Sequence, residues 1–348
     1  MVAWIFGIVL FALGVCVSVA LHEAGHMVTA KMFGMKVRRY FIGFGPKIWS
    51  FRRGETEYGI KAIPAGGFCD IAGMTALDEV TPAEQPRAMW RFPAWKRVIV
   101  MVSGSITHFI LGFVVLYLMA VGMGLPNLAD KPSLSAIQPC VVGVAPGVDP
   151  LRPTCGPNDP APARDAGFQP GDEIVAVAGR PTPTWTETVA AVQGLSGQER
   201  TLTVDVPQVA REFTNPDGST SVRPVGTIGV FNTRVFEYNA LTAFGGAAGF
   251  TGDMFTRIWD SLLKLPAKVP AVISAIGGAE RDVDTPVSVV GASVIGGDAV
   301  EQGLWSLFLL LLASLNFFVG VFNLLPLLPL DGGHIAVILY EKVRDWVL

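Results

Sequence analysis

The sequence predicts a polytopic α-helical membrane protein that also carries a sizeable polar portion. Its 348 residues are 51% apolar and only 16% charged, and the mean hydropathy is +0.47. A helix needs roughly 20 apolar residues to cross a bilayer. Three stretches without Asp, Glu, Lys or Arg are long enough, namely 1–21, 98–126 and 304–330. The net charge of −3 gives no reason to expect nucleic-acid binding.

Residues 1–30 are predicted to form the first membrane helix. The segment lacks a basic leader and an A-x-A cleavage site, and it continues through apolar residues after His26. We therefore expect a retained span and not a removable signal peptide. His22, Glu23 and His26 fall inside this span, although ionisable side chains in a bilayer are costly and usually mark function.

Residues 31–97 are predicted to be a cytoplasmic, membrane-associated β region. They contain twelve Lys or Arg against six Asp or Glu, and such an excess of basic residues marks a cytoplasmic loop. Segment 38–68 alternates aromatic or branched residues with polar ones around Gly and Pro, which is typical of strands and hairpins. We expect these strands to lie against the membrane near the histidines, and a peripheral hairpin is the alternative. Residues 98–126 then form the second span.

Residues 127–240 are predicted to be an extracytoplasmic linker followed by a small α+β domain. After an irregular, Pro-rich stretch, the chain shows a turn, a strand at 173–178, a helix and a further strand at 201–206. Thr184 and Glu187 form a capping box at the start of the helix.

This order of elements resembles a PDZ domain, and the stretch QPGDEI at 169–174 carries the resemblance. PDZ domains accept an extended peptide as an added strand. Alternatively, this PDZ-like domain only packs or blocks access, and binds no peptide.

The four cysteines divide between two environments. Cys140 and Cys155 both lie in the external segment, where we expect a disulfide that closes a loop worth about 3 kcal/mol. Cys16 in the first span and Cys69 in the cytoplasmic loop are expected to be small buried hydrophobes.

The last part of the chain is predicted to return through the membrane. Residues 241–303 should form an external amphipathic segment lying on the membrane surface, with a helix over 254–269 that Pro266 and Pro270 break. Residues 304–333 form the third span, and residues 334–348 a helix on the cytoplasmic side.

His22 and His26 are four residues apart, so on an α-helix both imidazoles project from one face and can hold one metal ion, with Glu23 beside the remaining coordination position. Zinc proteases use this H-E-x-x-H arrangement, and with only four His and thirteen Glu a chance match is rare. The alternative is a hydrogen-bonded polar network without metal. Burying three polar side chains in lipid without a strong partner would be costly.

A catalytic zinc usually has three protein ligands and one open position, so a third ligand must come from elsewhere. The candidates are His108, His334 and a membrane-embedded carboxylate. Asp331 is the first charged residue after Glu301 and follows Pro326 and Pro329, which must interrupt regular helix. Broken backbone at membrane depth is tolerated only when it is buried in protein or lines a cavity. Asp331, given freedom by two following glycines, is thus well placed to reach the metal; the alternative is that it caps a helix.

These motifs together resemble the site-2 proteases, the intramembrane zinc metalloproteases. The resemblance rests on H-E-A-G-H at 22–26, Asn-x-x-Pro at 323–326, Leu-Asp-Gly-Gly at 330–333 and the PDZ-like insert. Longer matches at 34–46, 52–74 and 303–308 resemble the actinobacterial branch.

The resemblance implies roles for particular residues. His22, His26 and Asp331 would ligate Zn²⁺, and Glu23 would act as general base. Three further residues would bind the substrate: Gly66 and Gly67 in the hairpin, which would hold an unwound strand near the metal, and Asn323.

Two departures from the family pattern stand out. Many bacterial members carry Gly-Pro-x-x-Asn in the second span, whereas this chain has His108 in place of that Asn. His108 either contacts the substrate, as a hydrogen-bond donor to the transition-state oxyanion, or packs with its ring bonded to a backbone carbonyl. Members also often have a fourth span after Asp-Gly-Gly. Here the chain stops at Leu348, so it is either shortened or lacks that helix.

The implied activity is hydrolysis of single-span membrane proteins, such as anti-sigma factors, in regulated intramembrane proteolysis. The enzyme would be a multi-pass protein of the plasma membrane, and the external PDZ-like domain would act as a size filter. A metal-binding transporter or a scaffold without catalysis is the alternative. Transporters normally show paired sites or internal repeats, which this sequence lacks, and the presence of Glu23 favours the enzyme.

Overall fold

The computed structural model describes residues 1–75, 77–142, 155–195, 208–214, 219–276 and 288–347. The chain divides into two compact units. One contains residues 1–123 together with 238–348, and the other contains residues 124–237.

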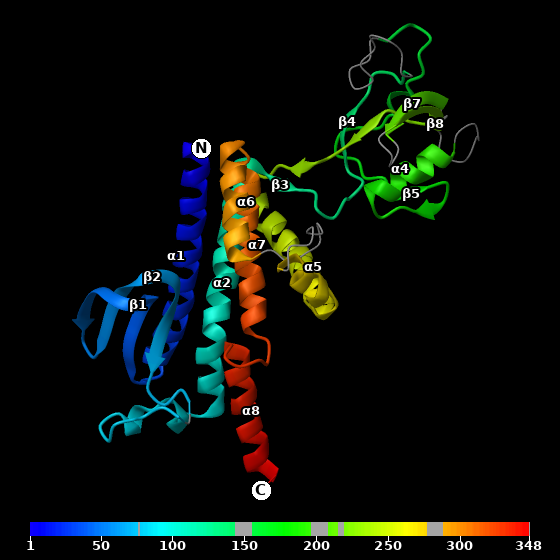
Figure 1. Ribbon diagram of the computed structural model, residues 1–348. Helices are drawn as coiled ribbons and strands as arrows, with labels where there is room; N and C mark the ends of the chain where they lie inside the picture. The colour runs from blue at the N-terminus through cyan, green and yellow to red at the C-terminus, as the bar shows by residue number, and fades with distance from the viewer. Residues whose placement is uncertain (76, 143–154, 196–207, 215–218, 277–287, 348) are drawn as a thin grey trace. The chain divides into compact units, whose positions relative to one another are not determined.

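Three helices of the first unit are long and apolar enough to cross a membrane: α1 (Val2–Met32), α2 (Ala94–Met123) and α7 (Trp305–Asn323). They lie side by side in Figure 1. The three spans predicted from uncharged stretches are therefore confirmed. The other helices of this unit are α5 (Thr242–Ile276), α6 (Val289–Glu301) and α8 (Asp331–Val347).

Helix α6 packs closely along the N-terminal half of α1. Glycines make this possible, because a Cβ on Gly7 would lie 2.8 Å from the Cβ of Val300, and one on Gly297 would lie 2.7 Å from Cγ1 of Ile8. Phe11 of α1 is fully buried at the same contact. Small residues let helix backbones approach in this way in membrane proteins. The sequence predicted only a surface-lying segment here.

Helix α5 differs from the prediction, because it continues through Pro266 and Pro270 where the sequence predicted breaks. Each proline removes one backbone donor and crowds the preceding turn. The two prolines are four residues apart and both are exposed, so both rings and both missing donors fall on one outward side. The opposite side of the helix keeps its hydrogen bonds.

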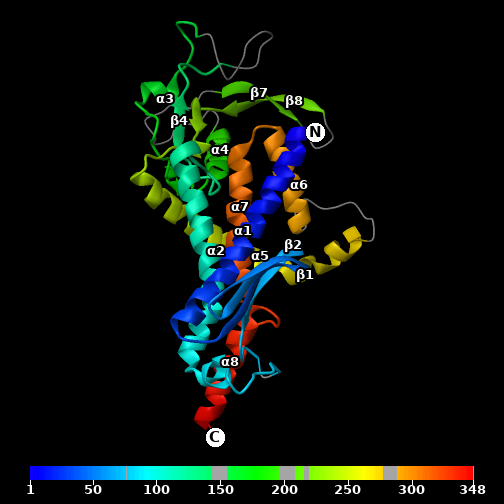
Figure 2. The same ribbon diagram turned by 90° about the vertical axis from the view of Figure 1, so that its left-hand side faces the viewer.

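The predicted hairpin consists of the long strands β1 (Val37–Arg53) and β2 (Thr56–Ile71). Residues 39–42 pair on one side with 67–70 and on the other with 57–60. The two strands therefore bend into a sheet in which 39–42 is central. The sheet lies against the C-terminal half of α1 (Figure 1 and Figure 2).

Two hydrogen bonds attach this sheet to α1. The Tyr40 hydroxyl donates to the carbonyl of Ala20 at 2.6 Å, and Nζ of Lys31 donates to the Tyr58 hydroxyl at 2.6 Å. Cys69 is half-buried in β2, and burial raises the pKa of its thiol, in keeping with the predicted unreactive role. The sheet is thus a fixed part of the helical unit.

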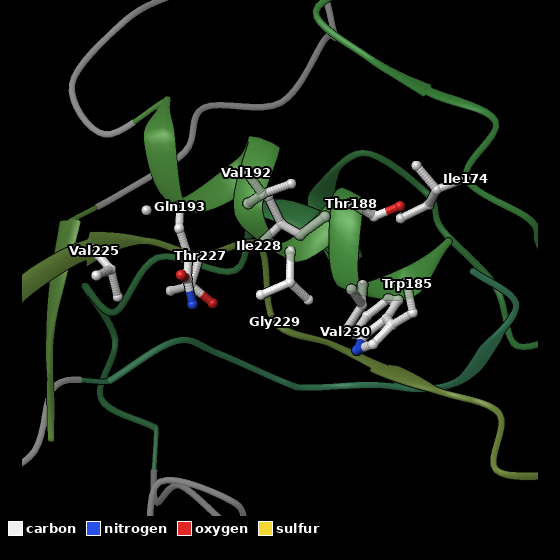
Figure 3. Close-up of a pocket in the computed structure, with 12 residues that line it drawn as sticks. Ile174, Trp185, Thr188, Val192, Gln193, Val225, Thr227, Ile228, Gly229 and Val230 are labelled. Atoms are coloured by element: carbon white, nitrogen blue, oxygen red, sulfur yellow. The ribbon is translucent and has the colours of Figure 1, made fainter. Parts of the chain in front are cut away.

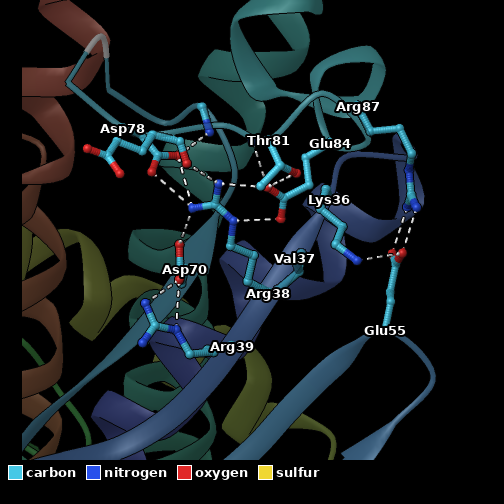
Figure 4. A network of polar contacts seen from close by, with 12 residues as sticks. Lys36, Val37, Arg38, Arg39, Glu55, Asp70, Asp78, Thr81, Glu84 and Arg87 are labelled. Carbon is cyan, nitrogen blue, oxygen red and sulfur yellow. Dashed lines mark hydrogen bonds and ion pairs between the residues drawn. The ribbon is translucent and has the colours of Figure 1, made fainter.

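A network of charges outside the helices holds the segment that follows the sheet (Figure 4). This segment contains the short 3-10 helices η1 (Gln85–Arg87) and η2 (Met89–Arg91). Arg38 of β1 donates to Glu84 at 2.8 Å and to Asp78 at 2.9 Å. Hydrogen bonding to Arg38 lowers the pKa of Glu84 from 4.5 to about 2. The stabilisation from this pair is therefore full above pH 4.5 and is lost as the pH falls through about 2.

The second unit is built from short elements. Its helices are α3 (Pro162–Asp165) and α4 (Trp185–Gly194), and its strands are β3 (Leu125–Pro126), β4 (Leu134–Ile137), β5 (Ala176–Val177), β6 (Arg180–Pro181), β7 (Gln208–Thr214), β8 (Thr220–Gly226), β9 (Val230–Asn232) and β10 (Val235–Phe236). The strands form antiparallel pairs. A small apolar core joins them, made of Leu134, Ile174, Val177 and Ile228.

The second unit contains some of the predicted elements and departs from others. The Thr184 side chain accepts a hydrogen bond from the backbone N–H of Glu187, so the expected cap does start α4. The predicted strand at 173–178 shrinks to β5 plus an isolated bridge at Glu173. The strand predicted at 201–206 lies outside the described residues. The disulfide between Cys140 and Cys155 is present, with Cα atoms 5.8 Å apart.

A groove of about 260 Å³ lies between α4 and the chain from Val225 to Val230 (Figure 3). Trp185 and Val192 line it from the helix, and Ile228 lines it from the opposite chain. It is the kind of space, between a helix and extended backbone, that can receive a peptide.

Replacing Arg38 with Met should release segment 73–91, because the change removes the hydrogen bonds to Asp78 and Glu84 together. Limited trypsin digestion of the purified protein should then cut within this segment several-fold faster. Arg39→Met is the matched control, since the Arg39 side chain is 53% exposed and forms an ion pair with a single carboxylate. Equal digestion rates for the two variants would contradict this account.

Candidate metal centre

The H-E-x-x-H stretch lies within α1, close to its C-terminal end. His22 and His26 are 7% and 5% exposed, and Glu23 between them is half-buried. The two imidazole rings meet edge to face, with centroids 4.7 Å apart. The helical spacing therefore brings both rings to one buried face, as the sequence predicts.

Asp331 approaches this face because one helix ends and the next helix begins beside the two histidines. Helix α7 ends at Asn323 and α8 begins at Asp331. The connecting chain folds back onto Gly332 and Gly333, where a Cβ on Gly333 would lie 2.7 Å from the Leu327 carbonyl carbon. These glycines therefore permit close packing, whereas the sequence predicted that they would loosen the chain.

Helix α8 is held in place by its contacts with α2. Ile338 is buried in a core that includes Val100 and Met101 of α2. Arg97 of α2 donates to Glu341 of α8 at 2.8 Å. These contacts fix the helix whose first residue carries the carboxylate.

Three ligand-type atoms converge between α1 and α8. Oδ2 of Asp331 lies 3.3 Å from Nε2 of His22 and 3.4 Å from Nε2 of His26, and the two nitrogens are 3.1 Å apart. Ligands of a tetrahedral zinc, at bonds of 2.0–2.1 Å, lie about 3.3 Å from one another. Oδ2 of Asp331 is buried and makes no hydrogen bond with the described residues. The spacing of these three atoms thus fits the ligands of one zinc ion and leaves a fourth coordination position free.

The neighbouring helix α2 shapes the cluster. Nδ1 of His26 donates to the Val100 carbonyl at 2.7 Å, which leaves the lone pair of His26 on Nε2, toward the cluster. Gly104 faces both rings, and a Cβ there would lie 2.6 Å from Cε1 of His22 and would also overlap the ring of His26. A side chain at position 104 would therefore displace the imidazoles.

Strand β2 passes beside Glu23. A Cβ on Gly67 would lie 3.2 Å from Cγ of Glu23. Gly66 has a φ of +134°, which a side chain rarely adopts, and a Cβ there would press on the ring of Phe44. Both glycines predicted to bind substrate thus lie on the strand next to Glu23.

His108 is close to the cluster, and it has a partner that sequence reasoning missed. The ring is 3% exposed, and Nδ1 lies 2.9 Å from Oδ1 of Asn316 on α7. The signal for Asn316 was available, because a buried amide in an uncharged span calls for a polar partner. The ring bonds to this side chain, whereas the packing alternative expected a backbone carbonyl.

The remaining candidates lie outside the cluster. Asn323 is half-buried at the end of α7. His334 is half-buried on α8 and lines a cavity of about 530 Å³ together with Arg97 and Glu341. Of the three candidates for a third ligand, the carboxylate is therefore the one that the fold brings to the two histidines.

The chain is similar to known zinc metalloproteases. The family model for peptidase family M50 matches residues 10–347. The zinc metalloprotease Rip1 of Mycolicibacterium smegmatis is 49% identical over 362 residues, which cover 98% of this chain and 87% of that protein. The zinc metalloprotease Rip1 of Mycobacterium tuberculosis (strain H37Rv) is 45% identical over 358 residues, covering 99% and 88%.

The chain therefore belongs to peptidase family M50, the site-2 proteases. It is a zinc metalloendopeptidase with Zn²⁺ as its cofactor. Its three apolar helices make it a multi-pass membrane protein. The family indicated by the sequence motifs is confirmed.

Replacing Gly104 with Ala should weaken zinc binding, because the added methyl group overlaps the space of both imidazoles. We expect a loss of affinity of about 10- to 100-fold, as when the surroundings of a metal ligand are disturbed. Gly122→Ala in the same helix is the control, since a Cβ there meets nothing within 4 Å. The measurement is zinc affinity by chelator competition, and full affinity in the Gly104 variant would refute the proposed packing.

Proposed function

We propose that the protein cleaves single-span membrane proteins, such as anti-sigma factors, in regulated intramembrane proteolysis. The observation that carries the proposal is the convergence of two imidazoles and one carboxylate on helices α1 and α8, beside helices long enough to span a membrane. A soluble protease would have no use for such a placement, because ionisable groups at membrane depth are costly.

In this proposal His22, His26 and Asp331 hold Zn²⁺, and Glu23 is the general base. Zinc bound there would supply Lewis-acid chemistry, which acidifies a water molecule and polarises the scissile carbonyl. The Glu23 carboxylate takes a proton from the attacking water and returns it to the leaving amine. Its half-buried position next to both histidines allows it to do both.

The sheet would present the substrate. A transmembrane helix must unwind before its peptide bond can be attacked, and the freed backbone groups then need partners. Strand β2 offers backbone around Gly66 and Gly67 directly beside Glu23, so an extended substrate could pair there as an added strand. Asn323, at the end of α7, would contact the substrate from another helix.

We place residues 31–97 in the cytoplasm and residues 127–303 outside, within the plasma membrane. The support is the excess of basic residues in the first loop and the length of the second segment. The α4 groove supports a PDZ-like role for the second unit, either in peptide binding or as a size filter for substrates (Figure 3).

The variant Glu23→Gln tests the catalytic role. It should retain zinc, because Glu23 is not one of the converging ligands, and cleavage of a reconstituted single-span reporter should fall about 10²- to 10⁴-fold. Glu57→Gln in the sheet is the control and should keep both properties. Undiminished cleavage by the Glu23 variant would defeat the proposal.

The variant Asp331→Asn tests the ligand set. A neutral amide is a poor zinc ligand, so zinc measured by elemental analysis should fall from about one ion per chain to a small fraction of that. Asp345→Asn in the same helix is a matched control, because that side chain is 62% exposed. Zinc retained by the Asp331 variant would remove the carboxylate from the site.

A further inference from the structure

The two histidines of the cluster differ in what holds their second ring nitrogen. Nδ1 of His26 donates to the Val100 carbonyl, whereas Nδ1 of His22 is buried and has no hydrogen-bond partner among the described residues. Metal-binding imidazoles almost always donate this second N–H to an acceptor, which fixes the tautomer and the ring orientation. His22 therefore needs an acceptor close to its ring.

His108 is placed to be that acceptor. It lies four residues after Gly104 on α2, and so on the same face, one turn further along. The centroids of the His108 and His22 rings are 5.0 Å apart. Two imidazoles joined by a direct N–H···N bond have their centroids about 5 Å apart. The separation of the two rings is therefore that of a bonded pair.

The proton arrangement on His108 follows from Asn316. Nδ2 of Asn316 donates to the Leu312 carbonyl at 2.8 Å, so its amide oxygen is the atom that faces His108. An amide oxygen only accepts, and Nδ1 of His108 must therefore carry the proton. The neutral ring then has its lone pair on Nε2. This favours an acceptor at Nε2 over the oxyanion donor, which was one of the two alternatives that the sequence left open for His108.

We propose that His108 is a positioning residue for the metal site. Its Nε2 accepts the Nδ1–H of His22, and Asn316 fixes its tautomer. A chain of hydrogen bonds from the Leu312 carbonyl through Asn316 and His108 thus orients the lone pair on Nε2 of His22 toward the zinc position. The Val100 carbonyl does the same for His26. The inference rests on the proposed ligand set of His22, His26 and Asp331.

The experiment compares zinc affinity of the full-length protein in detergent by chelator competition. His108→Phe keeps the ring volume but removes the acceptor, and Asn316→Leu removes the group that fixes the tautomer. Each should weaken zinc binding by about 10- to 100-fold. The double variant should be no weaker than the worse single variant, because both changes interrupt one series of bonds.

The control is Ser105→Ala on the same helix, since Ser105 is fully buried and its hydroxyl has no partner among the described residues. It should keep wild-type zinc affinity. Thermal unfolding of the metal-free variants checks that each one folds, and either His108→Phe or Asn316→Leu alone suffices for the test. Zinc affinity within twofold of wild type in a folded variant would overturn the inference. Lost cleavage with unchanged affinity would also overturn it, because His108 would then act on the substrate.

Asp331→Asn, measured in the same series, separates this inference from the proposed function. Zinc kept by the Asp331 variant would refute the ligand set itself. Zinc lost by that variant but bound normally by His108→Phe would refute only the positioning role.

Discussion

The structure depends on bringing one carboxylate to two buried imidazoles across separate helices. Asp331 starts α8, whereas His22 and His26 project from α1, and all three are largely withdrawn from solvent. Polar groups in such a place are costly unless they have a strong partner. Neighbouring residues allow the carboxylate and the imidazoles to come together. Gly104 leaves room for the rings, and the chain before Asp331 folds tightly onto Gly332 and Gly333.

Charges that lie away from the metal cluster help to hold the sheet in position. Strand β2 carries Gly67 beside Glu23 and ends at Ile71, where the segment held by Arg38 begins. Asp70, near the end of the strand, pairs with Arg39 at 2.7 Å. An ion-pair network outside the spanning helices therefore contributes to the alignment of the backbone next to Glu23.

Features that depend on local pattern could be predicted from the sequence. The three spans follow from the lack of charge over sufficient length, the hairpin from alternation, and the paired histidines from helical spacing. A contact between distant segments could be predicted only where a chemical requirement linked them, as the need for a third ligand linked Asp331 to the two histidines. Other such contacts could not be predicted. His108 and Asn316 are 208 positions apart, and no periodic signal connects them. The passage of α5 through Pro266 and Pro270 also escaped prediction, because it depends on which side of the helix is outward.

The close contact between α1 and α6 restricts the movement of α1. Gly7 and Gly297 hold one end of α1 against α6, while the sheet and α2 hold the other end. Because α1 is held at both ends, it cannot rotate about its own axis without breaking these contacts. The imidazoles of His22 and His26 therefore keep one orientation. Helix α5 contacts the same unit through Phe255, whose ring rests against Phe109 and Phe317.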